Sequence, residues 1–166
     1  MINMYKVLAF LTVISLVAAC ETTTPDPSGQ LMSISDLGGN PGYSWYQTEI
    51  ASYTPDASMV DSIVSNFQPA DEKVCIFVRP SCGCRGTQRL FPQIMKTLMD
   101  AKLDTSKIEI WSMRNPSDKT PYSSTLELTT LPSIVVIKNG VESARIVDAD
   151  YNEVNADTLI ANAIVK

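Results

Sequence analysis

The segment that most constrains the fold is the nearly continuous apolar run Lys73 to Val78, KVCIFV. Such a run is typical of a central strand that is buried within a sheet. It is followed by Thr87 to Lys102, where six apolar residues recur at helical spacing. From about Leu31 onward, strand-like and helix-like segments alternate in this way, so the sequence predicts an α/β domain.

The remaining elements are predicted from shorter patterns. We expect strands at Ser44 to Tyr53, Ile108 to Met113, Ser133 to Lys138 and Val141 to Val147, and helices at Asp56 to Phe67 and after Asn155, the expected N-cap. Asn139 and Gly140 favour the tight turn of an antiparallel hairpin between the last two strands. The chain between Met113 and Ser133 is expected to be irregular.

The first twenty residues have the layout of an export signal. Lys6 is followed by an apolar run, Val7 to Ala18, that is too short for a comfortable transmembrane helix. Val17 to Cys20, VAAC, resembles a bacterial lipobox. We therefore expect residues 1–19 to be a lipoprotein signal peptide, and Cys20 to carry acyl chains such as palmitate that anchor the protein to a bacterial membrane.

The residues after Cys20 predict a linker. Glu21 to Gln30, ETTTPDPSGQ, is polar and rich in Thr and Pro, a composition that does not pack into a core. We expect residues 20–40 to form a flexible tether and residues 41–166 to form the folded domain. Glu21 is not the aspartate linked to inner-membrane retention in enteric bacteria, so the periplasmic side of the outer membrane is mildly favoured.

Composition narrows the function of this domain. The 166 residues suit one domain, and 13 basic against 18 acidic residues argue against nucleic acid as a partner. Histidine, the commonest general base and imidazole metal ligand, is absent. Asp148, Asp150 and Asn152 mimic the start of a calcium loop, but its glycine and closing glutamate are missing. We expect a monomer with neither metal nor cofactor.

Three stretches of the chain resemble the thioredoxin-like family. They are FVRPSCGCRGTQRLFP at Phe77 to Pro92, NPSDKTPYSSTLELTTLPSIVVIKNG at Asn115 to Gly140, and the closing VDADYNEVNADTLI. The resemblance spans roughly Ser44 to Lys166 and implies a central mixed sheet flanked by helices. It also implies a cis peptide bond before Pro132, which would face the active cysteine, while the backbone of Leu131 would pair with an extended substrate strand.

The reactive cysteines of this family lie between the central strand and the next helix, usually as CxxC. Here Cys82 and Cys84 stand at that place, separated by a single glycine. Backbone amides and the dipole at a helix N-terminus favour a thiolate and lower its pKa. Arg79, Arg85 and Arg89 add positive charge nearby. We therefore expect Cys82 and Cys84 to carry the chemistry, with Arg85 as an auxiliary residue.

Two alignments leave the attacking cysteine open. Counted from the strand, Phe77 leads to Cys82 as the family's first cysteine. Counted back from the helix, Pro92 lies eight residues after Cys84, the family's usual interval, and Thr87 then stands in place of the second cysteine as a further auxiliary candidate. Either way, a bond between the two cysteines closes a small ring, so we expect a strained and easily reduced disulfide.

Two features depart from the family. Ser81 or Gly83 stands where a tryptophan usually precedes the first cysteine, and the strand Val74 to Val78 contains no carboxylate for proton transfer. Cys75, inside this strand, is expected to be an inert core thiol.

These patterns favour a membrane-anchored, extracytoplasmic thiol:disulfide oxidoreductase whose partners are protein thiols and disulfides. Two alternatives remain. One is a copper(I)-handling module, because two thiolates suit that soft ion. The other is a non-catalytic binding domain in which the cysteine pair is a structural staple.

Overall fold

Strand β2 (Glu72–Val78) lies at the centre of a five-stranded sheet in the computed structural model, which describes residues 28–166. Every residue from Val74 to Val78 is buried, as the apolar run predicts. β3 (Ile108–Ser112) is parallel to β2 on one side, and β4 (Ser133–Lys138) is antiparallel to it on the other. The sheet is therefore mixed, and the predicted α/β class is confirmed.

Two strands form the edges of the sheet. β1 (Gln30–Met32) pairs with β3 and β5 (Val141–Val147) pairs with β4, both antiparallel, which gives the order β1-β3-β2-β4-β5. In the turn between β4 and β5, Asn139 and Gly140 have φ values of 51° and 78°. Positive φ at two successive turn residues is what a type I′ hairpin requires, so the predicted hairpin is confirmed.

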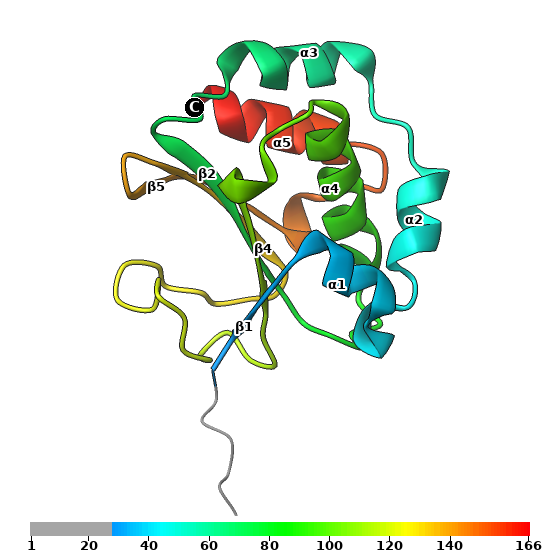
Figure 1. The fold of residues 1–166 in the computed structure, drawn as a ribbon, viewed down its shortest axis with the longest axis vertical. Coiled ribbons are helices and arrows are strands. Elements are labelled where there is room, and N and C mark those ends of the chain that lie inside the picture. The colour runs from blue at the N-terminus through cyan, green and yellow to red at the C-terminus, as the bar shows by residue number, and fades with distance from the viewer. Residues whose placement is uncertain (1–27) are drawn as a thin grey trace, which may run out of the picture.

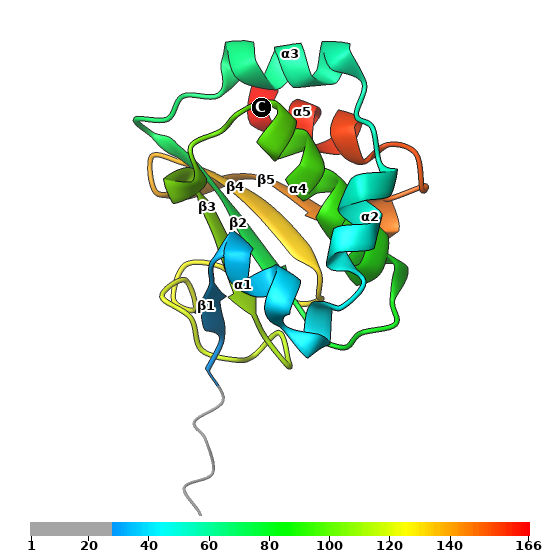
Figure 2. The same cartoon turned by 45° about the vertical axis from the view of Figure 1, so that its right-hand side comes forward.

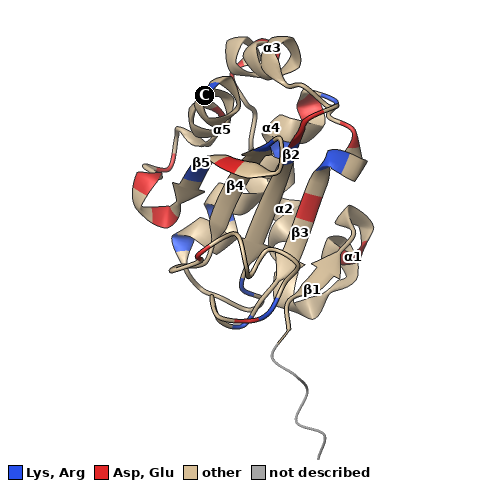
Figure 3. Ribbon diagram, turned by 90° about the vertical axis from the view of Figure 1, so that its left-hand side faces the viewer, with Lys and Arg blue, Asp and Glu red and all other residues tan. Residues whose placement is uncertain are grey.

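The α-helices of the described residues gather on one face of the sheet (Figures 1 and 2). They are α1 (Ile34–Gly39), α2 (Tyr46–Ser52), α3 (Ala57–Asn66), α4 (Phe91–Asp100) and α5 (Ala156–Val165). The opposite face is covered by the segment 113–132, which passes in front of the strands in Figure 3 and is irregular, as expected.

Alternate residues of β2 belong to two separate cores. Val74, Ile76 and Val78 pack among the helices. Cys75 and Phe77 pack on the other face, beneath the irregular segment. This is the period-two alternation of any strand, and it places the two faces of β2 in different chemical surroundings.

The predicted first strand at Ser44 to Tyr53 is wrong, because this segment contains α2. The ring of Tyr46 lies 5.4 Å from that of Phe91, at the start of α4, and the ring of Tyr43 lies 6.3 Å from it. Aromatic residues favour strands by propensity, but here their packing against α4 decides the local structure.

The predicted tether extends too far along the chain. Gln30–Met32 form β1, and α1 begins after Ser33. The Ser33 hydroxyl accepts the N–H of Asp36 at 3.2 Å, and the Asp36 carboxylate accepts the N–H of Ser33 at 3.1 Å. This reciprocal capping box fixes the start of the helix. Cys20 and the predicted signal peptide lie outside the described residues.

Within residues 28–166, no helix has both the length and the apolar character needed to cross a bilayer.

The predicted helices that became α3, α4 and α5 are confirmed, with differences at their ends. A wider π-type turn, Gly86–Leu90, precedes α4. Asn155 is the N-cap residue of α5, as predicted, but its side chain makes no capping hydrogen bond, because its Oδ1 accepts the N–H of Asn152 at 3.0 Å. Asp157, in the first turn of α5, instead accepts the N–H of Asp56 at 2.8 Å and so ties α5 to the start of α3.

Candidate functional site

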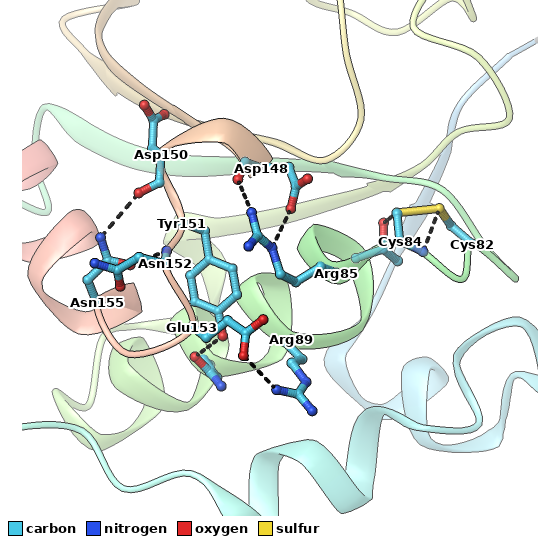
Figure 4. Close-up of polar contacts among 12 residues, drawn as sticks. Cys82, Cys84, Arg85, Arg89, Asp148, Asp150, Tyr151, Asn152, Glu153 and Asn155 are labelled. Atoms are coloured by element: carbon cyan, nitrogen blue, oxygen red, sulfur yellow. Dashed lines mark hydrogen bonds and ion pairs between the residues drawn. A yellow bond between two sulfur atoms is a disulfide. The ribbon is translucent and has the colours of Figure 1, made fainter.

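Cys82 and Cys84 form a disulfide where β2 gives way to a helix (Figure 4). Both residues are half-buried. The carbonyl of Cys84 accepts the N–H of Gln88 at 3.0 Å, which is the first hydrogen bond of the helix. The N–H of Cys84 donates to Sγ of Cys82 at 3.3 Å. The pair therefore lies at the strand-to-helix junction that the sequence predicts.

The turn that presents Cys82 is held by the loop before α2. Ser81 has a φ of 56°, the left-handed region that costs an L-residue energy. Its N–H donates to the carbonyl of Gly42 at 2.8 Å. A Cβ added to Gly42 would lie 2.8 Å from Cβ of Pro80, so only glycine fits this close approach. The two loops are thus locked together beside the disulfide.

Thr87 is fully buried and its Oγ1 lies 3.1 Å from Sγ of Cys84. A disulfide sulfur has no proton to give, so the threonine hydroxyl is the donor in this contact. When the disulfide is reduced, the same hydroxyl can donate to a Cys84 thiolate, and hydrogen bonds to a charged group are the stronger ones. The auxiliary position predicted for Thr87 thus faces Cys84.

Gly86 joins the cysteine turn to the predicted substrate loop. The Leu131–Pro132 peptide bond is cis, as expected, and Pro132 is buried. A Cβ added to Gly86 would lie 2.8 Å from Cγ of Pro132 and 2.8 Å from Oδ1 of Asp148. The start of the helix, the cis-proline loop and the chain after β5 therefore meet at this glycine. Sequence reasoning missed its role, because the contact joins three distant segments.

Two arginines on the first turns of the helix are paired with carboxylates (Figure 4). Nε of Arg85 lies 3.6 Å from Oδ1 of Asp148, one of its NH2 groups donates to the Asp148 carbonyl at 3.2 Å, and its guanidinium lies 5.4 Å from the centroid of the Tyr151 ring. Arg89 lies 3.3 Å from Glu153. The positive charge predicted from these two residues is therefore largely compensated.

Cys75 lies on the far face of the sheet, away from the helices, and is the free cysteine of the described residues. Burial raises the pKa of its thiol to about 11. Its Sγ lies 4.0 Å from Oε2 of Glu109, which also accepts hydrogen bonds from Tyr122 at 2.6 Å and Trp111 at 3.1 Å. Burial opposes ionisation of Glu109, but these bonds and Lys73 at 3.0 Å outweigh it and lower its pKa.

The side chains that mimic a calcium loop after β5 bond to the backbone of their own loop. Oδ2 of Asp150 accepts the N–H of Val147 at 2.9 Å, and Oδ1 of Asn152 accepts the N–H of Val154 at 3.3 Å. These side chains therefore stabilise the loop itself. In the part of the chain that the structure describes, no three acidic, cysteine or histidine side chains come together as a metal site.

A cleft of about 740 Å³ opens beside the cysteine turn. Its walls come from the start of β1, the loop before α2, the residues Pro80 and Ser81, and the chain that follows β3. Sequence reasoning missed this cleft, because only the fold brings these four segments together.

Comparisons of the chain with protein-family models, with curated proteins and with solved structures found no match. The chemistry of the site is therefore inferred from its own residues and geometry.

Proposed function

We propose that the protein is a thioredoxin-like thiol:disulfide oxidoreductase that acts outside the cytoplasm through Cys82 and Cys84. The observation that carries this proposal is a half-buried disulfide at a helix N-terminus, packed through Gly86 against the ring of Pro132. A disulfide in this position is within reach of a partner thiol, and the helix amides favour the anion that exchange releases.

The arrangement of the elements supports the resemblance to the thioredoxin-like family. β2 leads through the cysteine turn and α4 into the parallel strand β3. The cis proline stands immediately before β4, and the hairpin β4–β5 and the terminal helix α5 complete the domain. From β2 onward this is the order that the resemblance implies, with an irregular segment between β3 and β4.

The reaction is two successive thiol–disulfide exchanges. A substrate thiolate attacks one sulfur of the Cys82–Cys84 bond, which breaks, and the other cysteine leaves as a thiolate. A mixed disulfide now joins protein and substrate. A second substrate thiolate attacks the substrate sulfur of this bond and releases the protein cysteine. The substrate dithiol is oxidised to a disulfide and the protein disulfide is reduced to a dithiol, and the two protons lost by the substrate thiols are taken up by the two protein sulfurs. The reverse sequence reduces a substrate.

Contacts favour Cys84 as the stabilised, attacking sulfur of the reduced protein. It stands at the first hydrogen bond of the helix, and Thr87, buried beside it, offers a hydroxyl to its sulfur. Gly86 brings the same turn against Pro132. Cys82 then acts as the resolving cysteine, on the side of the left-handed residue Ser81.

A disulfide-exchange assay with three serine variants tests the proposal. Catalysed reduction of insulin, or refolding of scrambled ribonuclease, should fall to background in Cys84→Ser and strongly in Cys82→Ser. Cys75→Ser is the matched control, because this thiol faces the other side of the sheet, and its rate should match wild type. Equal rates in wild type and Cys84→Ser would refute the proposal.

The two serine variants also separate the roles of the two sulfurs. Cys82→Ser should accumulate a mixed disulfide with substrate through Cys84, because no resolving thiol remains to break it. Cys84→Ser should accumulate little. The opposite result, with trapping only through Cys82, would assign attack to Cys82 and leave the oxidoreductase function standing.

We propose further that acylation at Cys20 anchors this domain to a membrane, with only the stretch up to β1 as its linker. Ten residues of extended chain reach at most about 35 Å, so the site would stay close to the bilayer surface. Labelled palmitate should enter the wild-type protein and not Cys20→Ser, which should also leave the membrane fraction. Equal fractionation of the two proteins would refute the anchor.

A further inference from the structure

The arginines are concentrated at one end of an acidic protein. The chain carries a net charge of −5. Of its five arginines, Arg79, Arg85 and Arg89 lie close to the cysteine turn in sequence, and Arg114 lines the cleft. Arg145, the fifth, lies in β5 and pairs with Glu142. Because the chain as a whole is negative, a group of arginines makes the local charge at this end more positive than that of the rest of the surface.

These four arginines fall into two classes. Arg85 and Arg89 are paired with carboxylates of the chain after β5. Arg79 and Arg114 are exposed and make no ion pair with any described side chain. The paired arginines tie the helix to the loop after β5. The unpaired arginines can bind a negatively charged group of a partner.

The two unpaired arginines leave the sheet at the same end. β2 and β3 are parallel, with Val78 opposite Ser112, and the N–H of Met113 donates to the carbonyl of Val78 at 2.8 Å. Arg79 directly follows Val78, and Arg114 directly follows Met113. Both cations therefore emerge where β2 and β3 end, which is where the cysteine turn begins.

The cleft described above lies at this end and is mainly polar. Arg114 is in its wall, and so is Ser81, the residue before Cys82. The one carboxylate among the lining residues, Asp118, is buried and already accepts the N–H groups of Arg114 at 2.7 Å and Asn115 at 3.2 Å. Its hydrogen bonds hold the backbone, so the guanidinium of Arg114 remains available.

We propose that this cleft binds an acidic, extended segment of the partner polypeptide, next to the cysteine that exchanges with Cys82 and Cys84. The inference rests on the oxidoreductase function and adds its substrate class. Arg79 and Arg114 receive the partner's carboxylates, because a guanidinium is shaped to bind a carboxylate through two hydrogen bonds. A segment held against Ser81 presents its neighbouring cysteine to the disulfide.

Two synthetic peptides test the proposal. They share one cysteine and one sequence, except that aspartates and glutamates flanking the cysteine in the first are asparagines and glutamines in the second. At low ionic strength, wild type should react with the acidic peptide roughly threefold to tenfold faster, the range expected for two exposed ion pairs. The preference should shrink as salt is added, because exposed charges are screened.

Charge variants locate the preference. In Arg79→Gln/Arg114→Gln the ratio of the two rates should fall to about one. Arg89→Gln and Arg145→Gln are matched controls that remove the same charge from paired arginines, and both should keep the wild-type ratio. Equal rates for the two peptides with wild type, or a ratio unchanged in the double variant, would overturn the proposal.

A binding measurement separates this inference from the proposed function. In Cys82→Ser/Cys84→Ser no exchange is possible, so fluorescence anisotropy of labelled peptides reports the cleft alone. Tighter binding of the acidic peptide, lost when Arg79→Gln/Arg114→Gln is added, supports the cleft even if neither peptide reacts with wild type, a result that would refute only the oxidoreductase function. Equal binding of both peptides would refute the acidic-segment proposal while leaving the exchange chemistry intact.

Discussion

Cys75 and Cys84 lie close together in the sequence but in opposite chemical surroundings. Cys75 is fully buried within β2, and burial raises the pKa of its thiol to about 11. Cys84 is half-buried just beyond the end of that strand, with the first turn of a helix and the hydroxyl of Thr87 beside its sulfur. The strand thus buries the sulfur of Cys75, whereas the junction after the strand leaves the sulfur of Cys84 partly accessible to solvent.

The largest expected difference is in thiol reactivity. After reduction, iodoacetamide near neutral pH should modify Cys84 at least about 100-fold faster than Cys75, because alkylation proceeds through the thiolate. Mass spectrometry of tryptic peptides over time measures both rates in one sample. In denaturant the two cysteines should be alkylated at the same rate. If their rates were also comparable in the folded protein, the proposed difference between Cys75 and Cys84 would be refuted.

The buried thiol also predicts how stability depends on pH. The pKa of Cys75 rises from an ordinary value of 9.0 to about 11 on folding, so the unfolded chain loses this proton first. The contribution of the protonated Cys75 thiol to the free energy of unfolding is complete below about pH 9 and is lost as the pH rises toward about 11. Urea unfolding should show this decline, by up to about 2 kcal/mol. Cys75→Ala should flatten it, and an identical slope would contradict the assignment.

Gly86 and Gly83 offer a matched pair of substitutions within one turn. Gly86→Ala places a Cβ against Pro132 and Asp148, so it should cost about 2 kcal/mol of unfolding free energy and slow thiol exchange. Around Gly83 no atom lies within 4 Å of an added Cβ, and Gly83→Ala should change stability by less than about 0.5 kcal/mol. Equal costs would show that the helix start does not press on the cis-proline loop.

Removing the Thr87 hydroxyl should lower the reactivity of the Cys84 thiol without unfolding the protein. Thr87→Val keeps the volume but removes the donor to Cys84, so alkylation of reduced Cys84 near neutral pH should slow by about tenfold. Thr97→Val is the control, because this buried threonine of α4 donates to the Gln93 carbonyl instead. The proposed role of Thr87 requires the first variant alone to shift the pH midpoint of alkylation.

The smallest effect is expected at Ser81. Ser81→Gly should stabilise the fold by about 0.5 kcal/mol, because glycine adopts the left-handed conformation without steric cost. Lys102→Gly, at a φ of 55° far from the cysteines in sequence, should give a similar gain. Only the Ser81 variant should alter the exchange rate; a change in both would show a general effect of stability.

Local patterns predicted the elements that hold the site. The apolar run of β2, the helical spacing in α4 and the Asn139–Gly140 turn each depend on neighbouring residues, and each is confirmed. The cis peptide before Pro132 was expected only from the family resemblance, and it is present. Propensity failed at α2, where packing of Tyr46 on Phe91 decides the structure.

The surroundings of the site could not be predicted in the same way. Arg85 and Arg89 read as free positive charges in the sequence, but Asp148 and Glu153, which neutralise them, come from a loop more than sixty residues later. The close approach at Gly86 likewise depends on three separate segments. Such contacts follow from tertiary packing, which leaves no periodic signal in the sequence.

The loop that ends at Tyr43 shows that the domain needs residues upstream of Ser44. The Gly42 carbonyl accepts the N–H of Ser81, and the Tyr43 hydroxyl donates to Ser112 at 2.8 Å, so the start of the cysteine turn and the end of the neighbouring strand β3 are both held by residues upstream of Ser44. A fragment trimmed to the stretch that resembles the family would keep every cysteine of the domain and lose these struts. A protease that cuts just before Ser44 should therefore lower the proposed exchange activity while leaving every cysteine of the domain in place.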